Sequence, residues 1–263
     1  MPIEIPTHPI GDAFPQYFEM LKQQGRLDEL VSPNPEHVAD EILNNIVRSN
    51  CGTIHILHAD AMFSGKTTAA IFASRGLYNE GIDTHCFQPN AAIRFGEEQR
   101  QRILTNHRRK ELSLPATTTG NHLREVYDHI ITGKIPACSL IIIDDLMLYV
   151  DHGVKVDEVV VLLDEMKRLG LHIIGTGLTR TFQDEPFTFF PQLVDIAGDM
   201  GWKNKEMSTV CVHCGKKAKA TRRYVPEENG GRRIAKYTDP FKQEGSHDIY
   251  EPVCVDLHPS CIK

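Results

Sequence analysis

The sequence lacks long hydrophobic runs and any excess of positive charge. No apolar stretch in its 263 residues approaches the roughly 18 residues that a membrane-spanning helix needs. The beginning, MPIEIPTHPI, has neither the basic segment nor the apolar core of a secretory signal. Lys and Arg number 29 against 35 Asp and Glu, so the formal net charge is −6. An acidic balance argues against a protein that coats nucleic acid or an anionic membrane. We expect a cytoplasmic protein with no nucleic-acid or membrane partner.

The seven cysteines are too few for a disulfide-rich scaffold, and they are unevenly placed. Cys51, Cys86 and Cys138 are scattered over the first half, and the other four cluster near the end. An odd and uneven set argues against a disulfide framework and indicates a reducing compartment with one metal site. The remaining composition, 41% apolar and 24% charged, is that of an ordinary globular protein.

Strand and helix patterns alternate along the middle of the chain. Short β-rich or apolar runs predict strands at Thr53–Leu57, His85–Gln88, Leu140–Ile143 and Leu171–Gly175. Amphipathic segments predict helices at Thr67–Glu80, Asn121–Thr132 and Asp157–Leu169, the last burying Val160, Leu163 and Met166. Strands separated by helices predict βαβ units, and therefore an α/β fold with a parallel sheet flanked by helices. The stretch Ala91–Thr119 lacks periodicity and is expected to be a long excursion beside the active site.

The sequence patterns at the two ends of the chain differ from those of this middle part. Residues 1–50 predict a helical extension, with helices at Pro15–Gln24, burying Phe18 and Leu21, and after the N-cap residue Asn34. We interpret it as an extra helical layer on the main domain, with a partner-binding or oligomerisation arm as the alternative. Residues 51–205 form the expected α/β domain, and residues 206–263 a small β-rich, metal-held subdomain.

A phosphate-binding loop is the strongest motif. It lies between a predicted strand and a predicted helix, where backbone N–H groups can point at phosphate oxygens. Lys66 would bring positive charge to the β- and γ-phosphates, and the Thr67 hydroxyl could ligate Mg²⁺. The full motif has glycine five residues before Gly65, and Asp60 stands there instead. The candidate nucleotide-binding residues are Met62, Phe63, Ser64, Gly65, Lys66, Thr67 and Thr68.

Two carboxylates follow the apolar strand Leu140–Ile143. Asp144 and Asp145 would lie at its carboxyl end, the edge of an open α/β sheet at which ligands bind. Asp144 would serve Mg²⁺. Asp145 would face the acceptor as general base, so the two carboxylates would divide the work.

These motifs resemble the type II (cellular-type) thymidine kinase family, from about Thr53 to His258. The resemblance rests on Ala61–Thr67, Arg94-Phe95-Gly96, Gly177–Phe182 with Glu185–Phe187, Cys211–Ala218 and Tyr250–Cys254, which occur in the family's order. It implies transfer of the γ-phosphate from ATP·Mg²⁺ to the 5′-hydroxyl of a pyrimidine deoxynucleoside, most often thymidine. It also implies a P-loop fold with a zinc-bound lasso and a homo-oligomer, either a tetramer or a dimer.

The resemblance assigns further residues and exposes departures. Asp145 stands where the family has a glutamate base, one methylene longer. Met147 and Leu148 replace a usual glutamine and phenylalanine, and Thr179 replaces a usual aspartate. These changes leave two alternatives open: a family-derived nucleotide-binding protein without nucleoside kinase activity, or a kinase for a modified pyrimidine deoxynucleoside. The candidate substrate-binding residues are Met62, Leu148, Leu178, Phe182, Phe187 and Tyr250.

A metal-ligand pattern occupies the last part of the chain. Cys211 and Cys214, separated by two residues, and the distant Cys254 are spaced for tetrahedral Zn²⁺. The family has its fourth ligand three residues after the third, where this chain has leucine. We favour His258 as the fourth ligand, with Cys261 as the alternative. Four protein ligands would make this zinc structural.

Overall fold

Seven strands form the main sheet of the computed structural model, which describes residues 13–49, 52–90, 103–105, 112–149, 155–227, 230–236, 238–239 and 249–254. The strand order is β3-β4-β2-β5-β6-β1-β7, and all neighbours are parallel except the edge strand β3, which is antiparallel to β4. The strands are β1 Ile54–Ala59, β2 Thr84–Pro89, β3 Ile103–Thr105, β4 Ser113–Thr119, β5 Leu140–Ile143, β6 His172–Leu178 and β7 Lys203–Glu206. The predicted α/β fold is confirmed.

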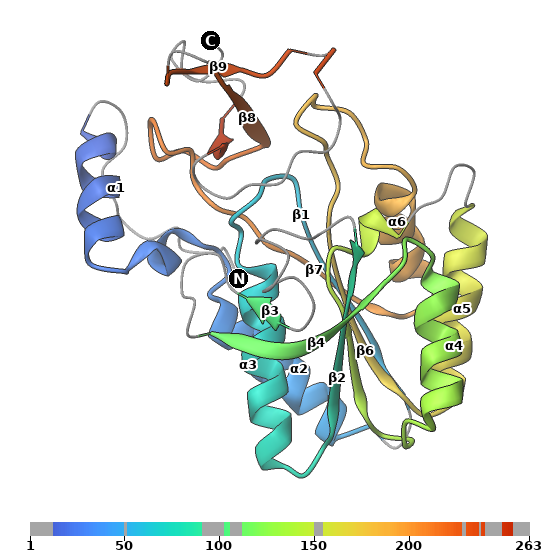
Figure 1. Ribbon diagram of the computed structural model, residues 1–263. Coiled ribbons are helices and arrows are strands. Elements are labelled where there is room, and N and C mark those ends of the chain that lie inside the picture. The colour runs from blue at the N-terminus through green and yellow to red at the C-terminus, as the bar shows by residue number, and fades with distance from the viewer. Residues whose placement is uncertain are drawn as a thin grey trace.

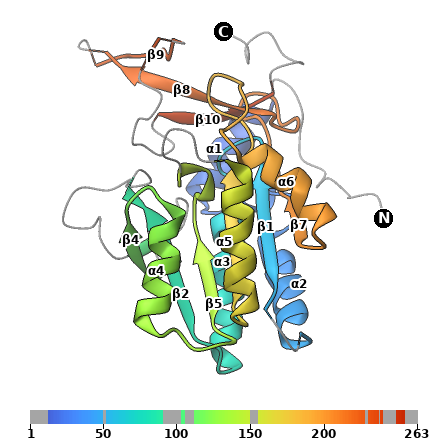
Figure 2. The ribbon, with the colours of Figure 1, turned by 90° about the vertical axis from the view of Figure 1, so that its right-hand side faces the viewer.

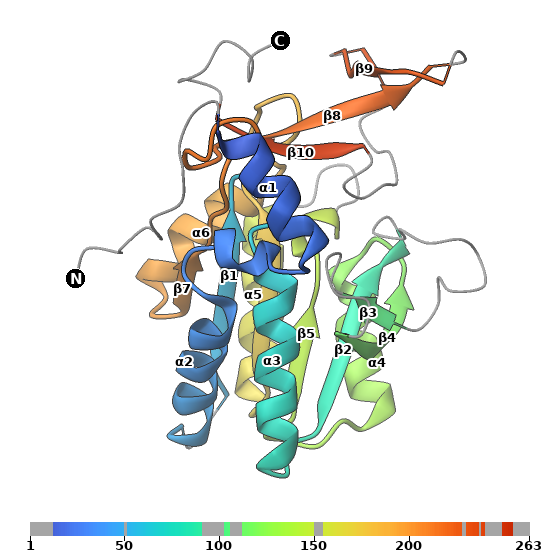
Figure 3. The ribbon, with the colours of Figure 1, turned by 90° about the vertical axis from the view of Figure 1, so that its left-hand side faces the viewer.

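Helices cover both faces of this sheet (Figures 2 and 3). One face carries α2 (Pro35–Val47) and α3 (Lys66–Asn79), and the other carries α4 (Leu123–Gly133), α5 (Val156–Arg168) and α6 (Phe190–Asp199). Each face has its own apolar core. The strand β5 is buried along its whole length, which explains its uninterrupted Leu-Ile-Ile-Ile sequence.

A second sheet lies above the carboxyl ends of the main strands (Figure 1). It has three antiparallel strands in the order β10-β8-β9, with β8 Ala220–Pro226, β9 Arg232–Ile234 and β10 Tyr250–Val253. The strands of this second sheet all follow β7, the last strand of the main sheet along the chain.

The described part of the extension contains α1 (Phe14–Gln23) and the 3₁₀ helix η1 (Leu27–Leu30) before α2. As predicted, α2 starts after Asn34, whose side-chain Oδ1 accepts a hydrogen bond from the Glu36 amide at 2.8 Å. In α1 the buried residues are Phe14 and Leu21, whereas Phe18, which we expected to be buried, is only half-buried. Helix α2 packs against α3, so this part of the extension is a helical layer on the main domain.

Several elements differ from the sequence expectations. The stretch expected to be an irregular excursion contains β3 and β4, while Arg94-Phe95-Gly96 lies outside the described residues. The patterns predict neither α6 nor the edge strand β7, which is entirely polar. In α5, Leu163 and Met166 are buried as expected, but Val159 is buried where we expected Val160, which is only half-buried. Among the described residues, no helix is long and apolar enough to cross a membrane.

Burial of His55 in β1 makes the stability of the fold depend on pH. His55 is 3% exposed, and within the described part of the chain its Nε2 has no hydrogen-bond partner. Burial, reinforced by the charges of His172 and Lys203, lowers its pKa from 6.5 to about 4. The unfolded chain therefore binds the proton more readily, so stability present above pH 6.5 is lost as the pH falls toward 4.

We expect the free energy of unfolding to be about 2 kcal/mol lower at pH 5 than at pH 7 because of this one group. Urea titrations at the two pH values measure the difference. The His55→Leu variant should lose most of it, because leucine is apolar and does not titrate. An equal pH dependence in this variant would show that other groups cause the effect.

Candidate active site

The loop between β1 and α3 has the backbone geometry of an anion cradle. Phe63 and Gly65 both have positive φ values, 62° and 81°, and Gly65 is the N-cap residue of α3. Ser64 is fully buried, and Lys66 is 8% exposed with its Nζ 3.0 Å from Ser64 Oγ, to which it donates. A buried ammonium group at the start of a helix attracts a multiply charged anion.

The two residues expected to serve Mg²⁺ lie side by side. The Thr67 hydroxyl, on the first turn of α3, donates to Asp144 Oδ1 at 3.0 Å. Asp144 is 3% exposed and directly follows β5. A hydroxyl and a carboxylate are oxygen ligands of the kind that Mg²⁺ prefers. The oxygen atoms of Thr67 and Asp144 therefore fit Mg²⁺ as ligands.

Thr176 links both aspartates, and the sequence reasoning missed it. Its hydroxyl donates to Asp144 Oδ1 at 2.6 Å and accepts from the Asp145 amide at 3.1 Å. Thr176 lies on β6, which pairs with β5, and is completely buried. The signal available in the sequence was a threonine inside the largely apolar run of residues 173–178.

Asp145 occupies a special backbone conformation. Its φ is 49° and its ψ is 46°, in the left-handed region, where it precedes the 3₁₀ helix η3 (Leu146–Leu148). Aspartate and asparagine tolerate this region better than residues with longer side chains. Asp145 is 5% exposed, beside the phosphate loop's partner Asp144. The backbone therefore favours aspartate at this position over a residue with a longer side chain.

Asp60 and Thr179, the two unusual residues at the ends of β1 and β6, bind each other. Ala59 pairs with Leu178, so the next residues on the two strands are neighbours. The Thr179 hydroxyl donates to Asp60 Oδ1 at 2.5 Å. The loop residue that replaces the motif's first glycine is thus held by the adjacent strand.

The candidate substrate-binding residues fall into two groups. Leu148, Leu178 and Phe187 are buried in the core between the sheet and helices α4, α5 and α6, and Met62 packs against that core. Phe182 and Tyr250 instead lie next to β8: Arg223 stacks over the Phe182 ring at 3.8 Å, and Tyr250 pairs with Arg223 across β10 and β8.

Strand β8 supplies two site residues that sequence reasoning did not identify. The Thr221 hydroxyl accepts a hydrogen bond from the Met62 amide at 2.9 Å, which ties the phosphate loop to the small sheet. Arg223, two residues further along the same strand, is 1% exposed. Alternate residues of a strand share a face, so one face of β8 contacts both the loop and Phe182.

Three cysteines form a candidate metal centre in the small subdomain. The sulfur atoms of Cys211, Cys214 and Cys254 all lie within 4.8 Å of one another and are buried. Three clustered thiols suit Zn²⁺, which binds thiolates tetrahedrally. His258 and Cys261, the two candidates for the fourth ligand, lie outside the described residues.

His213, one of the two residues between the paired cysteines, has a different partner. Its Nε2 lies 3.1 Å from Glu251 Oε2, which also accepts from the Tyr224 hydroxyl at 2.9 Å. Burial alone would raise the pKa of Glu251, but the hydrogen bonds from His213 and Tyr224 and the charge of Arg232 bring it to about 2. Glu251 thus joins β8, β9, β10 and the cysteine turn through one carboxylate.

Comparison with known proteins decides the family. The family model described as "Thymidine kinase" matches residues 52–258. The chain belongs to the thymidine kinase family. Thymidine kinases from two strains of Halobacterium salinarum, ATCC 29341 / DSM 671 / R1 and ATCC 700922 / JCM 11081 / NRC-1, are each 24% identical over 217 residues. Each alignment covers 80% of this chain and 95% of the relative.

Family membership makes the chain an ATP-dependent deoxynucleoside kinase, a phosphotransferase. The expected resemblance is confirmed, and the match contains the phosphate loop, both aspartates and the three cysteines. The roles of the individual residues remain predictions. The helices α1 and α2 lie before the matched range.

Proposed function

We propose that this kinase transfers the γ-phosphate of ATP to the 5′-hydroxyl of a pyrimidine deoxynucleoside, most simply thymidine. The observation that supports this best is the link from Thr67 through Asp144 and Thr176 to Asp145, which places the phosphate loop beside a second carboxylate. Phosphoryl transfer needs mainly positioning and charge neutralisation, and this arrangement supplies both.

In the proposed reaction, Asp145 accepts the proton of the 5′-hydroxyl. The 5′-oxygen bonds to the γ-phosphorus while the bond from that phosphorus to the β–γ bridging oxygen breaks, which releases ADP. Lys66 and the loop amides hold the phosphate charge that shifts during transfer. Thr67 and Asp144 would hold Mg²⁺, which would neutralise phosphate charge.

We further propose that Cys211, Cys214 and Cys254 hold a structural Zn²⁺, with His258 completing the site and Cys261 as the alternative. The metal would hold the turn before β8 against the end of β10, and so keep Thr221 and Arg223 over the loop. The proposal also includes a homo-oligomer, tetramer or dimer, that acts in the cytoplasm of the cell without nucleic-acid or membrane partners. The net charge of −6 supports the last point.

The nucleobase is tested by product formation. The purified zinc-loaded protein is incubated with ATP·Mg²⁺ and thymidine, deoxyuridine, deoxycytidine or 5-substituted deoxyuridines. We expect a monophosphate from thymidine. Faster turnover of a 5-substituted analogue would favour a modified pyrimidine as the substrate, an outcome motivated by Met147, whose sulfur accepts the Leu178 amide at 3.5 Å. Intact ATP binding without any product would contradict the proposal.

Thr176 offers a test of the link between the two aspartates. The Thr176→Val variant keeps the shape of the side chain but removes the hydroxyl that holds Asp144 and the Asp145 amide. We expect a loss of about 1–3 kcal/mol in unfolding free energy, because buried partners lose a hydrogen bond. Steady-state kinetics should show kcat about 10-fold lower, since both carboxylates lose their support. Thr176→Ser should restore most of the activity. Full activity in the valine variant would contradict this role.

A further inference from the structure

The extension reaches the phosphate loop itself. Residues 27–35, which we call the brace, run from η1 to the first residue of α2. A Cβ atom built on Gly65 would lie 2.7 Å from Pro35 Cγ, 2.8 Å from Val31 Cγ1 and 3.6 Å from Met207 Cε. Val31 and Met207 are 4% and 1% exposed. The brace therefore contacts the backbone of the loop directly, and leaves no space for a side chain at position 65.

The brace is held on both sides. The amides of Ser32 and Ser208 donate to each other's carbonyl oxygens, at 2.9 Å and 2.7 Å, which pairs the brace with the chain after β7. Leu27 and Leu30 pack with Val210, the residue before Cys211, in the cluster that includes α1. The brace thus connects the segment next to Cys211 with the phosphate loop at Gly65.

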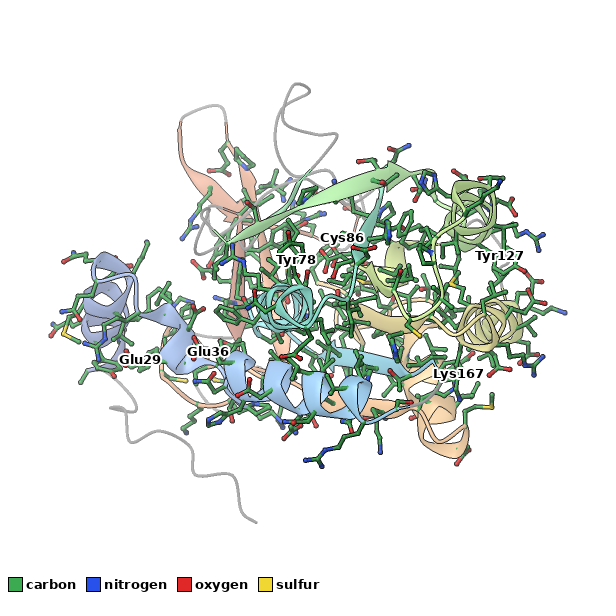
Figure 4. All side chains as sticks on the ribbon, turned by 90° about the horizontal axis from the view of Figure 1, so that it is seen from below. Glu29, Glu36, Tyr78, Cys86, Tyr127 and Lys167 are labelled. Atoms are coloured by element: carbon green, nitrogen blue, oxygen red, sulfur yellow. The ribbon has the colours of Figure 1, made fainter. Side chains whose placement is uncertain are left out.

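On its other side the brace continues into the helical layer. Val31 belongs to the same apolar cluster as the facing residues of α2 and α3, and α3 begins at the loop. Figure 3 shows α2 beside α3 with η1 at the upper end of the pair, and Figure 4 shows side chains filling the space between the two helices. An ion pair of 2.7 Å from Glu41 to Lys205 joins α2 to β7.

This contact matters because the loop conformation is strained. Phe63 has a φ of 62°, which is costly for a residue other than glycine, and such conformations persist only when the surroundings enforce them. The family match begins at residue 52, so the brace adds a contact from outside the matched range. We propose that Val31 and Pro35 are positioning residues that hold the phosphate loop in its nucleotide-binding conformation.

This inference rests on the proposed use of the loop for ATP. Its test is the full-length Val31→Ala variant, which removes the contact with Gly65 and leaves every loop residue in place. We expect the Kd for ATP·Mg²⁺, measured by calorimetry, to rise about 10-fold, because small errors of position are costly in such sites. The KM for ATP should rise in parallel, while the KM for the nucleoside and the zinc content stay unchanged. Pro35→Ala is the second variant if the first does not fold.

The matched control is Leu43→Ala. Leu43 packs in the same apolar cluster, against Gly76 on α3. Gly76 lies ten residues after Lys66 along that helix. It should lower stability comparably yet leave the Kd for ATP unchanged. Equal shifts of Kd in both variants, or a lower Tm with unchanged Kd in Val31→Ala, would overturn the inference. Because ATP binding is read directly, an inactive wild-type protein that binds ATP would count against the proposed function and not against the brace.

Discussion

Replacing Asp145 with asparagine should lower kcat by about 10²- to 10⁴-fold, the usual contribution of a general base. Asparagine tolerates the left-handed backbone that Asp145 adopts at φ 49°, so the variant should fold normally. It also keeps the backbone amide that donates to Thr176. The change therefore removes the carboxylate charge with little else. Rapid quench of a single turnover measures the chemical step, and ATP affinity measured by calorimetry should stay within a factor of about two.

The matched control is Asp195→Asn, on the exposed side of α6 and far along the chain from the loop. It should behave like wild type in both measurements. If Asp145→Asn retains its turnover, another group accepts the proton. If it loses ATP binding as well, Asp145 acts on the nucleotide and not on the acceptor.

Removing the side chain of Lys66 should have a comparable effect on kcat by acting on the phosphates instead of the acceptor. Lys66→Ala deletes the buried ammonium that now donates to Ser64. We expect kcat to fall by about 10²- to 10³-fold, because a preorganised charge at the transferring group is lost. Lys66→Arg should not restore the rate, since the planar guanidinium is larger and binds in a different geometry.

The control for this variant is Lys167→Ala, at the last turn of α5 (Figure 4). Steady-state kinetics in ATP should be unchanged for it. The account is contradicted if Lys66→Ala raises the KM for the nucleoside alone, because the lysine would then serve the acceptor and not the phosphates.

Local patterns account for what could be predicted from the sequence. Two of these patterns are contiguous in the sequence: the apolar run of β5 followed by Asp144 and Asp145, and the loop before α3. In both, the residue types themselves indicate the chemistry. The structure brings Thr67 and Asp144 into contact, as that interpretation required. The three cysteines likewise lie together, and their spacing in the sequence was a strong enough signal to predict this.

The missed features are those that depend on contacts between distant segments. Thr176 resembles any strand residue until β5 and β6 pair, and Thr221 becomes a loop partner only when β8 lies above β1. The strand β7 reads Lys-Asn-Lys-Glu and carries no apolar signal, because its edge position beside β1 needs only backbone pairing. The contact of Val31 with Gly65 joins segments more than thirty residues apart and leaves no local pattern.

The most direct test of the central claim is transfer of label from [γ-³²P]ATP to thymidine, with 5′-deoxythymidine and 3′-deoxythymidine as paired acceptors. The account predicts labelled monophosphate from thymidine and from the 3′-deoxy compound. It predicts none from the 5′-deoxy compound, which lacks the attacking hydroxyl. Labelled product from 5′-deoxythymidine, or release of inorganic phosphate alone with all three compounds, would contradict it.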